Sequence, residues 1–549
     1  MLSERYARSL DEVIPLIEEA ERDAREGKWT VLVVTFDSAP AFDASYVAAP
    51  PGLDWFAVAQ TYGERPANQI RVPKLTSSIP QFQAKLPQQD YLKQIQLLKQ
   101  HIARGDTYQV NYTFPLECSE DVYGADLFDL LCFPQPPPYA RYLKLADQEI
   151  LCLSPELFFE YTESEGEKQL RCRPMKGTRA RGRGDDAEIR AELQASEKDR
   201  AENLMVVDMV RNDLSRIAIT GSVHVPQLFE IEEYPTVWQM TSTVECRSRA
   251  SLVDIFRALF PCASIVGAPK IETLRIIKNT ESYSRGVYTG AIGIVGPNFA
   301  EICVAIRTMV IDKAKSNYSV GSGIVWDSEG SDEWAECLAK ARILEPFEDG
   351  LKLVETMFCG SEIFLLAEHL QRLKASADVF GFPFDEGHIV NRLKAIPSLN
   401  NLRVRLTLDA GGNIEIASSE VSSPPVQSPP LVSSLRARLA TRPLDSSNPW
   451  LRHKTTYRPF YEAAGGHDDV LHYNEKGHLT EFSIGNLVLD RAGVMVTPTL
   501  EDGLLAGVYR QSLLSDGAIK EARLTLEDLH KTKAAYRINS VRGWERVDF

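Results

Sequence analysis

The spacing of apolar residues predicts strands and helices in alternation along the chain. Residues 300–312, AEICVAIRTMVID, are rich in β-branched side chains and predict a mostly buried strand. Residues 196–217 predict a helix, and residues 331–343 predict another. The apolar stripe of the first helix would hold Leu204, Val207, Val210, Leu214 and Ile217. The pattern indicates an α+β or α/β protein, although it does not give the order of the strands.

Two breaks in this pattern divide the chain of 549 residues, which is longer than one hydrophobic core usually serves. The first is Pro-Phe-Glu-Asp-Gly at 346–350, just after a helix-like segment ends. The second is Val-Ser-Ser-Pro-Pro-Val-Gln-Ser-Pro-Pro at 421–430, where the prolines exclude a helix and favour an extended connector. We therefore expect one domain over 1–348 and a second over 349–549, with an inner connector at about 421–435.

The composition is typical of a soluble globular protein, with 44% hydrophobic and 25% charged residues. The formal net charge is -15 and no long basic run occurs, so we expect no nucleic-acid partner. An anionic substrate would need cations at its site, either arginine and lysine side chains or a metal ion. We expect no membrane span and no signal peptide, since apolar runs are short and the first residues are charged. The nine scattered cysteines form no CxxC pair, which fits a reducing, cytoplasmic setting.

Two predicted helices carry carboxylates at a spacing of three. One pair is Asp199 and Glu202, and the other is Glu333 and Glu336. This spacing places both acids of a pair on one helix face, and two such faces together would suit Mg²⁺. A structural role is the alternative for each pair, because Ser196 could cap a helix over Asp199 and Glu336 could pair with a lysine one turn later.

Short motifs in a fixed order surround these carboxylates. They are Gly105-Asp-Thr-Tyr-Gln-Val-Asn111, Ser154-Pro-Glu156, Arg173-Pro-Met-Lys-Gly-Thr178, Val207-Asp-Met-Val-Arg-Asn-Asp213, Ser264-Ile-Val-Gly-Ala-Pro-Lys270, Gly286-Val-Tyr-Thr-Gly-Ala-Ile-Gly293, Ala305-Ile-Arg-Thr308 and Gly321-Ser-Gly-Ile-Val325. Over about residues 90–345 this set resembles the chorismate-utilising enzymes, which include the anthranilate, isochorismate, salicylate and aminodeoxychorismate synthases. The resemblance implies an α/β sandwich of antiparallel sheets, a Mg²⁺ cofactor and chorismate as substrate.

The resemblance also assigns roles to matching positions. It implies that Glu202 and Glu336 bind Mg²⁺ directly, and that Asp199 and Glu333 hold water molecules on it. Catalytic roles are implied for Lys176, Glu156 and Thr178. Substrate contacts are implied for Arg307, Lys340, Tyr288, Gln239 and the backbone of Gly321, Ser322 and Gly323. These residue types suit the task, because arginine binds a carboxylate bidentately and glycine lets the backbone approach an anion.

Lys176 distinguishes members of this family, because aminodeoxychorismate synthases carry lysine where anthranilate synthases carry alanine. The resemblance implies that its amine attacks C2 of chorismate while Mg²⁺ helps the C4 hydroxyl to leave, after which ammonia adds at C4. Glu156 resembles the acidic group that would handle the proton of this lysine. Taken alone, Lys176 would be interpreted as a surface lysine. Gln239 stands where many relatives have histidine, and since glutamine cannot shuttle a proton near neutral pH, we expect only a polar contact there.

The last 200 residues carry a second ordered set of motifs. They are Glu355-Thr-Met-Phe-Cys-Gly360, Leu366-Ala-Glu-His-Leu-Gln-Arg-Leu373, His453-Lys-Thr-Thr-Tyr-Arg458, Leu479-Thr-Glu-Phe-Ser-Ile-Gly-Asn486, Thr497-Pro-Thr-Leu500 and Gly503-Leu-Leu-Ala-Gly-Val-Tyr-Arg510. This set resembles the fold-type IV pyridoxal phosphate enzymes, which include branched-chain and D-amino-acid aminotransferases and aminodeoxychorismate lyase. It implies a two-subdomain α+β unit with pyridoxal 5'-phosphate as cofactor.

The matching positions imply how that cofactor would be held. Lys454 would carry it covalently and act in catalysis, and Glu481 would keep its pyridine nitrogen protonated. Arg372 would contact the phosphate, together with backbone amides near Ile484, Gly507 and Val508. Tyr509 stands where a threonine often assists, so that contact is expected to be backbone only. Outside this ordered context, Lys454 would be interpreted as a surface lysine.

Together the two resemblances imply a fusion that makes p-aminobenzoate for folate. The first domain would aminate chorismate to 4-amino-4-deoxychorismate, and the second would release pyruvate to give 4-aminobenzoate. The alternatives are an anthranilate synthase-type enzyme fused to an aminotransferase, which Lys176 argues against, and a non-catalytic protein on these folds. The chain shows no glutamine amidotransferase motif, so ammonia is expected from a separate subunit. A homodimer through the second domain stays open, as does the role of the first 90 residues.

Overall fold

The structure is a computed structural model that describes residues 1–66, 80–120, 122–132, 137–180, 186–233, 237–312, 315–344, 351–396 and 401–549. The described residues up to 344 form one compact unit, and those from 351 onward form another. The predicted boundary at 346–350 lies outside the described residues. No helix among the described residues combines the length and the apolar character needed to cross a bilayer.

Two antiparallel sheets form the first unit over the residues that the structure describes. The larger sheet has the order β1 (Ser3–Ala7), β3 (Ala57–Tyr62), β2 (Trp29–Val34), β14 (Ala291–Gly296), β15 (Phe299–Val304), β8 (Leu157–Ser164), β9 (Glu167–Arg173), β12 (Val237–Ser248) and β10 (Met175–Ala180), with β11 (His224–Glu233) also on β12. The smaller sheet has the order β13 (Gly267–Ala268), β5 (Gln109–Cys118), β17 (Ser316–Ile324), β16 (Thr308–Asp312), β7 (Gln148–Ser154) and β6 (Tyr139–Lys144), with β4 (Gln83–Ala84) on β5.

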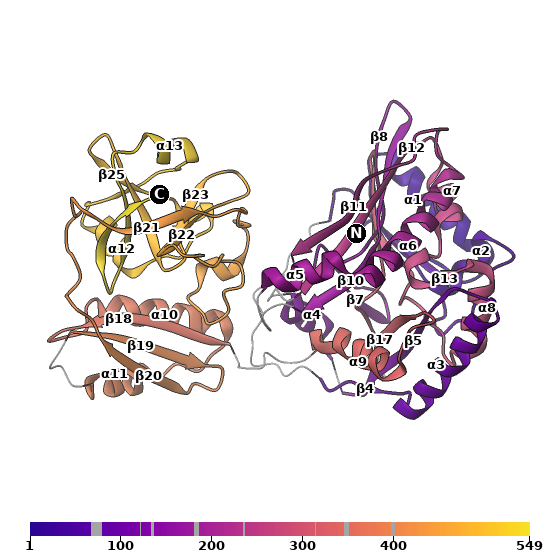
Figure 1. The fold of residues 1–549 in the computed structure, drawn as a ribbon, viewed down its shortest axis with the longest axis horizontal. Helices are drawn as coiled ribbons and strands as arrows, with labels where there is room; N and C mark the ends of the chain where they lie inside the picture. Colours follow the sequence, from indigo (N-terminus) through magenta and orange to yellow (C-terminus); the bar gives the residue numbers. More distant parts are fainter. Residues whose placement is uncertain are drawn as a thin grey trace. The chain divides into compact units, whose positions relative to one another are not determined.

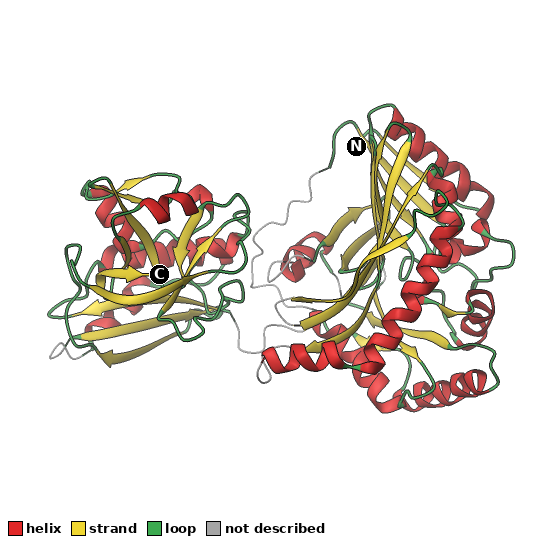
Figure 2. Ribbon diagram, turned by 45° about the horizontal axis from the view of Figure 1, so that its top comes forward, coloured by secondary structure: helices red, strands yellow, loops and turns green. Residues whose placement is uncertain are grey.

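The two sheets pack face to face, and a hydrophobic cluster lies between them. It joins Val33, Ile292 and Cys303 of the larger sheet to Leu143 and Ile150 of the smaller one. This arrangement confirms the predicted sandwich of antiparallel sheets. Helices cover the strands on the outside of the unit (Figure 2). They are α1 (Leu10–Arg25), α2 (Ala39–Phe42), α3 (Gln88–Ala103), α4 (Gly124–Cys132), α5 (Asp186–Ala195), α6 (Glu197–Ser215), α7 (Leu252–Leu259), α8 (Lys270–Thr280) and α9 (Gly330–Ala341).

The helix predicted over 196–217 is α6, and the one predicted over 331–343 is α9 followed by a 3-10 turn at Arg342–Leu344. Ser196 caps α6, since its hydroxyl accepts a hydrogen bond from the Asp199 backbone N–H. The apolar stripe is correct at Val207, Val210 and Leu214, which are buried. It is wrong at Leu204, whose side chain is 42% exposed, because the buried face of α6 runs through Asn203 and Val206 instead.

The single strand predicted over 300–312 is two strands in two different sheets. β15 ends at Val304 in the larger sheet, and β16 begins at Thr308 in the smaller one. Between them, the Arg307 backbone is left-handed, with φ 49. This conformation ends a strand, and residues other than glycine rarely adopt it. The prediction of one continuous strand was therefore wrong, since apolar composition does not reveal a change of sheet.

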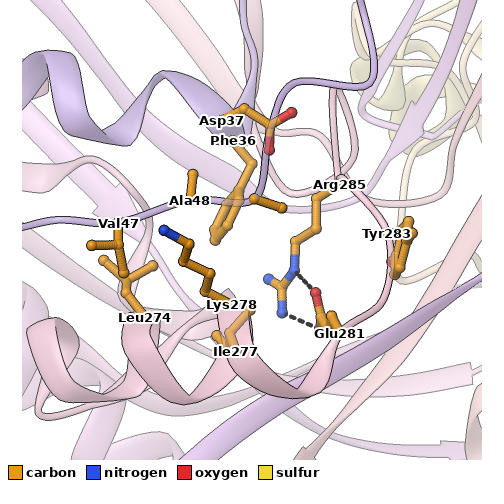
Figure 3. A pocket seen from close by; sticks show the side chains of 11 residues that line it. Phe36, Asp37, Val47, Ala48, Leu274, Ile277, Lys278, Glu281, Tyr283 and Arg285 are labelled. Atoms are coloured by element: carbon orange, nitrogen blue, oxygen red, sulfur yellow. Dashed lines mark hydrogen bonds and ion pairs between the residues drawn. The ribbon is translucent and has the colours of Figure 1, made fainter.

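A buried ion pair lies beside β5 of the smaller sheet. Arg285 donates to both oxygens of Glu281, and it also donates to the backbone oxygens of Ile265 and Asn111. Glu281 in turn accepts from the backbone N–H and the hydroxyl of Thr113 on β5. The pair borders a cavity of about 10 Å³ (Figure 3), room for about one water molecule. It therefore joins the end of α8 to β5 and to the segment leading into β14.

The second unit contains a small sheet and a closed one. In the small sheet, β18 (Lys352–Cys359), β19 (Leu402–Asp409) and β20 (Ile414–Glu420) are antiparallel neighbours in chain order. α10 (Leu366–Phe380) packs on β18 (Figure 1), and α11 (Glu386–Lys394) follows α10. The larger sheet contains β21 (Ser433–Leu439), β22 (Asp469–Tyr473), β23 (Leu479–Phe482), β24 (Gly485–Arg491), β25 (Val494–Thr497), β26 (Lys520–Glu521), β27 (Ala535–Asn539) and β28 (Gly543–Asp548), with α12 (Val508–Ser515) and α13 (Leu526–Lys531) beside it.

The larger sheet closes on itself, because β23 pairs with β24 as well as with β22. The two parts of the unit correspond to the two subdomains implied by the resemblance. Residues 421–430 contain no helix, and β21 begins at Ser433. The connector expected over about 421–435 stays a prediction.

Replacing Arg285 with methionine is expected to destabilise the first unit by about 3–5 kcal/mol, because Glu281 would remain buried without its counter-charge. The measurement is denaturant unfolding of the full chain. Arg275 on α8 pairs with Glu272 at an exposed position, so Arg275→Met is the control and should cost less than about 1 kcal/mol. Equal unfolding midpoints for the two variants would contradict the role of the buried pair.

Candidate active sites

Lys176 reaches from one sheet of the first unit toward the other. It lies on β10 of the larger sheet, where the pairing with β12 is irregular between Met175 and Thr178. A side chain at Gly323 on β17 would place its Cβ 3.1 Å from the Lys176 Nζ and 2.5 Å from Gln109 Nε2. Gly323 therefore leaves the space that the lysine amine and the Gln109 amide share. Gln109 has no role in the family resemblance, although it falls within its first motif.

Glu156 is buried beside this lysine. Its Oε1 accepts a hydrogen bond of 2.7 Å from the Ser264 hydroxyl. Burial raises the pKa of Glu156 to about 7, and the Ser264 hydrogen bond and the Lys176 charge oppose that rise. A carboxyl group with this pKa can accept or release a proton near neutral pH. The structure thus places a buried carboxyl group within electrostatic reach of the Lys176 amine.

Gln239 fixes the strand that carries Lys176. Its Nε2 donates to the Gly177 carbonyl at 2.8 Å, and its Oε1 accepts from the Thr178 hydroxyl at 2.7 Å. Both polar ends of the buried amide are thereby engaged on β10. The contact expected between Gln239 and substrate remains a prediction, and the hydrogen bonds indicate a positioning role that the sequence pattern did not suggest.

The two carboxylate pairs lie on α6 and α9, and three of the four acids have protein partners. Asp199 accepts from Arg179 at 2.6 Å, Glu333 accepts from the Ser328 hydroxyl at 2.7 Å, and Glu336 pairs with Lys340 at 2.6 Å. Both structural alternatives weighed from the sequence, the Ser196 cap and the Glu336 ion pair, are therefore present. Across the described ranges, no three His, Cys, Asp or Glu side chains gather closely enough to enclose a metal ion.

Glu202 has a different environment. Burial raises its pKa, Lys176 and Lys198 lower it, and the negative charges of Asp199 and Glu336 raise it further. Burial also acts to raise the pKa of Glu336, but the Lys340 ammonium holds it below its ordinary value. Glu202 and Glu336 therefore repel each other across the site, and a divalent cation between them would relieve that repulsion. Magnesium is commonly held by one or two carboxylates with its remaining ligands water, so this donor set fits it.

The residues expected to hold the substrate surround β17. Lys340 Nζ donates to the Gly321 carbonyl at 2.9 Å, and the Ser322 hydroxyl contacts Tyr91 at 3.1 Å. Tyr288 is buried. Arg307 is partly buried at the joint between β15 and β16, and its guanidinium has no side-chain partner among the described residues. Lys340 thus connects the carboxylate face of α9 to the glycine-containing strand.

A cavity of about 500 Å³ lies in the second unit. Its lining includes Lys454, Glu481, Arg372, Ile484, Gly507 and Val508, so the structure brings together all the positions at which the sequence places a cofactor. The segment with Lys454 follows a 3-10 turn at Pro449–Arg452, and its backbone bonds to Val354 on β18. Burial, together with the charges of Arg372 and Arg458, lowers the pKa of Lys454 to about 8.

Glu481 receives three hydrogen bonds inside this cavity. Tyr461 donates to its Oε1 at 2.6 Å, Leu505 N–H donates to the same oxygen at 3.0 Å, and Asn486 donates to Oε2 at 3.2 Å. Burial nevertheless raises the pKa of Glu481 to about 7. Burial of a carboxylate is unfavourable unless a cation pairs with it. Glu481 therefore suits a ligand that carries a positive charge.

Arg372 is held rigidly at the other side of the cavity. Its Nε and Nη2 bond to the two oxygens of Glu355 at 2.9 and 2.6 Å, and His369 bonds to the same carboxylate at 2.6 Å. Gly507 precedes α12, and a Cβ there would lie 1.9 Å from Asn486 Oδ1. Tyr509 is buried against Phe364, and the backbone-only phosphate contact expected there stays a prediction. Glu355 was not assigned a role from the sequence, although it opens the first motif of this region.

Residues 43–346 match the model of the family described as chorismate binding enzyme, and residues 352–548 match that of amino-transferase class IV. An aminodeoxychorismate synthase of Streptomyces griseus is 40% identical over 277 residues, 50% of this chain and 37% of that protein. An aminodeoxychorismate synthase component 1 of Bacillus subtilis is 37% identical over 281 residues, 50% of this chain and 59% of that protein. An anthranilate synthase component 1 of Haloarcula marismortui is 36% identical over 280 residues, 50% of this chain and 56% of that protein.

The matched regions therefore span from over a third to just under three fifths of these relatives. Among solved structures, anthranilate synthase component I from Streptococcus pneumoniae aligns with a TM-score of 0.51 and 23% identity. The alignment covers 61% of this chain and 85% of that one. This likeness shows the fold of the first unit.

Lys454 in protein freed of small ligands is expected to react with acetic anhydride as an amine of pKa about 8. Roughly half of it would be uncharged at pH 8, against under about 1% of an ordinary lysine. The test is competitive labelling followed by peptide mass analysis across pH 6–11, with exposed Lys374 as the control. A reactivity midpoint for Lys454 equal to that of Lys374 would show that the cavity does not depress its pKa.

Proposed function

Because the chain belongs to the chorismate binding enzymes, we propose that it makes p-aminobenzoate from chorismate in two steps. The first unit would aminate chorismate at C4, and the second unit would release pyruvate from the product. The relatives named aminodeoxychorismate synthase support the first step, and the amino-transferase class IV match supports the second.

The observation that carries the proposal is the position of Lys176. Its amine lies beside Gly323, near buried Glu156 and within the electrostatic reach of Glu202. A nucleophile needs a nearby group to take its proton and a path to the reacting atom. Under the proposal, the Lys176 amine attacks C2 of chorismate as the C4 hydroxyl leaves. Ammonia then adds at C4 and expels the lysine, while Glu156 takes and returns the proton.

Magnesium would be held by Glu202 and Glu336, with Asp199 and Glu333 contacting its water molecules. When bound, it would supply positive charge to the leaving hydroxyl. The residues of the chain do the rest of the positioning. Arg307 and Lys340 would bind the chorismate carboxylates, assisted by backbone amides at Gly321, Ser322 and Gly323, and Tyr288 would line the same space.

The second unit would use pyridoxal 5'-phosphate, which supplies an electron sink when bound. The cavity fits this group, because it offers an amine at Lys454, a buried acid at Glu481 and a fixed cation at Arg372. Backbone amides near Ile484 and at the start of α12, Gly507 and Val508, would contact the phosphate. Lys454 would move the proton that pyruvate release requires, and its lowered pKa suits that task.

The partners of the proposed reaction are chorismate and ammonia, the latter supplied by a separate glutamine amidotransferase. The second candidate function is an anthranilate synthase-type reaction joined to an aminotransferase, favoured by the relative of that name. The two differ in product, so mass analysis after incubation with chorismate and ammonium separates them. The absence of both p-aminobenzoate and aminodeoxychorismate would overturn the proposal.

Lys176→Ala is expected to lower kcat for C4 amination by roughly 10³-fold or more, as for loss of a covalent nucleophile. KM for chorismate should change much less, because the carboxylate-binding residues remain. Lys198→Ala is the matched control, since it removes an exposed lysine charge that also acts on Glu202. Unchanged amination by Lys176→Ala would sink the covalent mechanism, whereas a chorismate adduct on the peptide with Lys176 would support it directly.

Glu202→Gln and Glu481→Gln are expected to disable opposite halves of the chain. The first should abolish Mg²⁺-dependent amination of chorismate while added aminodeoxychorismate is still converted to p-aminobenzoate. The second should leave amination intact and block that conversion. Separate assays of the two steps provide each variant with its own internal control. Mg²⁺ dependence that persists in Glu202→Gln would mean that the metal lies elsewhere.

A further inference from the structure

The cavity of the second unit carries more positive charge than its cofactor needs. Of the described side chains that line it, eight are Arg or Lys and two are Glu. Gathering like charges around one space is unfavourable unless they are paired or a ligand neutralises them. The partners of each cation therefore decide which charges are available to a ligand.

Most of these cations are already engaged. Arg372 is bound to Glu355, Arg510 to Glu521, and Arg537 to Asp469 and Glu545. Arg458 donates to the Ser483 carbonyl and stacks over the ring of Tyr461. Lys454 and Arg372 are the residues assigned to the cofactor itself. These contacts leave three arginines of the lining.

Arg403, Arg405 and Arg542 have no acidic or other side-chain partner within the residues that the structure describes. Arg403 and Arg405 alternate on β19 with Val404, which is buried, so both project from the same face of the small sheet. Arg405 lies opposite Thr356 of β18, and Thr356 also lines the cavity. The face with these arginines is therefore the one turned to the cavity.

Arg542 lines the cavity from a different element. It lies in the turn between β27 and β28, where its backbone N–H bonds to Asn539 and its carbonyl to Val426. The backbone is thus fixed while the guanidinium stays exposed. A guanidinium without a partner can bind a carboxylate through two parallel hydrogen bonds. The arginines on β19 could therefore bind one carboxylate, and Arg542 could bind a second.

We propose that Arg403, Arg405 and Arg542 form a carboxylate-binding subsite that selects an amine with two carboxylates over a singly charged amino acid. This inference rests on the proposed function, whose lyase substrate would carry one carboxylate on its ring and another on its enolpyruvyl group. The arginines on β19 would bind one carboxylate and Arg542 the other. Arg372 and the start of α12 remain for the cofactor phosphate.

The first test is the kinetics of the cofactor-loaded full chain with aminodeoxychorismate. Each of Arg403→Gln, Arg405→Gln and Arg542→Gln should remove a charge-assisted contact, and the most affected should raise KM by about 10- to 100-fold. Cofactor affinity should stay unchanged. Arg392→Gln is the control, because Arg392 is exposed on α11 and does not line the cavity. An unchanged KM in all three variants would overturn the subsite.

The second test measures binding without turnover, using isophthalate with two carboxylates and benzoate with one. Isophthalate should bind the cofactor-loaded wild-type chain at least about 10-fold more tightly than benzoate does. The double variant Arg405→Gln, Arg542→Gln should lose that preference. Equal binding of the two acids by the wild type would overturn the inference alone. Failure of the wild type to convert aminodeoxychorismate would instead overturn the proposed function, and the isophthalate preference would still report on the subsite.

Discussion

The buried pair of Arg285 and Glu281 is the constraint on which the architecture of the first unit depends. Its hydrogen bonds reach β5 at Asn111 and Thr113 and the 3-10 helix that ends at Ile265. β5 pairs along β17, so the pair indirectly fixes the strand that carries Gly321 and Gly323. A buried ion pair is stable only while both charged groups keep their partners. The geometry around Lys176 thus rests on a contact that takes no part in chemistry itself.

Charge is arranged in opposite ways in the two units. In the first, acids on α6 and α9 lie near lysines, and burial, followed by the charges of Asp199 and Glu336, raises the pKa of Glu202 against the lysine charges. In the second, cations outnumber acids around the cavity, and the buried acid Glu481 is stabilised by neutral donors. The net charge of -15 therefore does not reveal the sign of the electrostatic field at either site. Each field corresponds to the ligand proposed for it, a cation in one and anions in the other.

Sequence patterns predicted the elements with a strong period and missed features set by long-range pairing. α6 and α9 were foreseen because apolar and acidic residues repeat at helical spacing, and the sandwich and the two-part second unit followed from the family resemblance. The break at Arg307 was missed, since a change of sheet leaves no mark in apolar composition. The contacts of Gln239 with Gly177 and Thr178, and the approach of Gln109 to Lys176, also require the fold, because each joins residues distant in the chain.

The left-handed backbone at Arg307 has a consequence for how this position can change. A residue with a Cβ held at φ 49 carries a conformational cost that glycine or asparagine would reduce. Either replacement would also remove the guanidinium that is the candidate anion ligand between β15 and β16. Stability and ligand affinity are therefore opposed at one residue, and selection for a more robust chain would act there against selection for tighter binding.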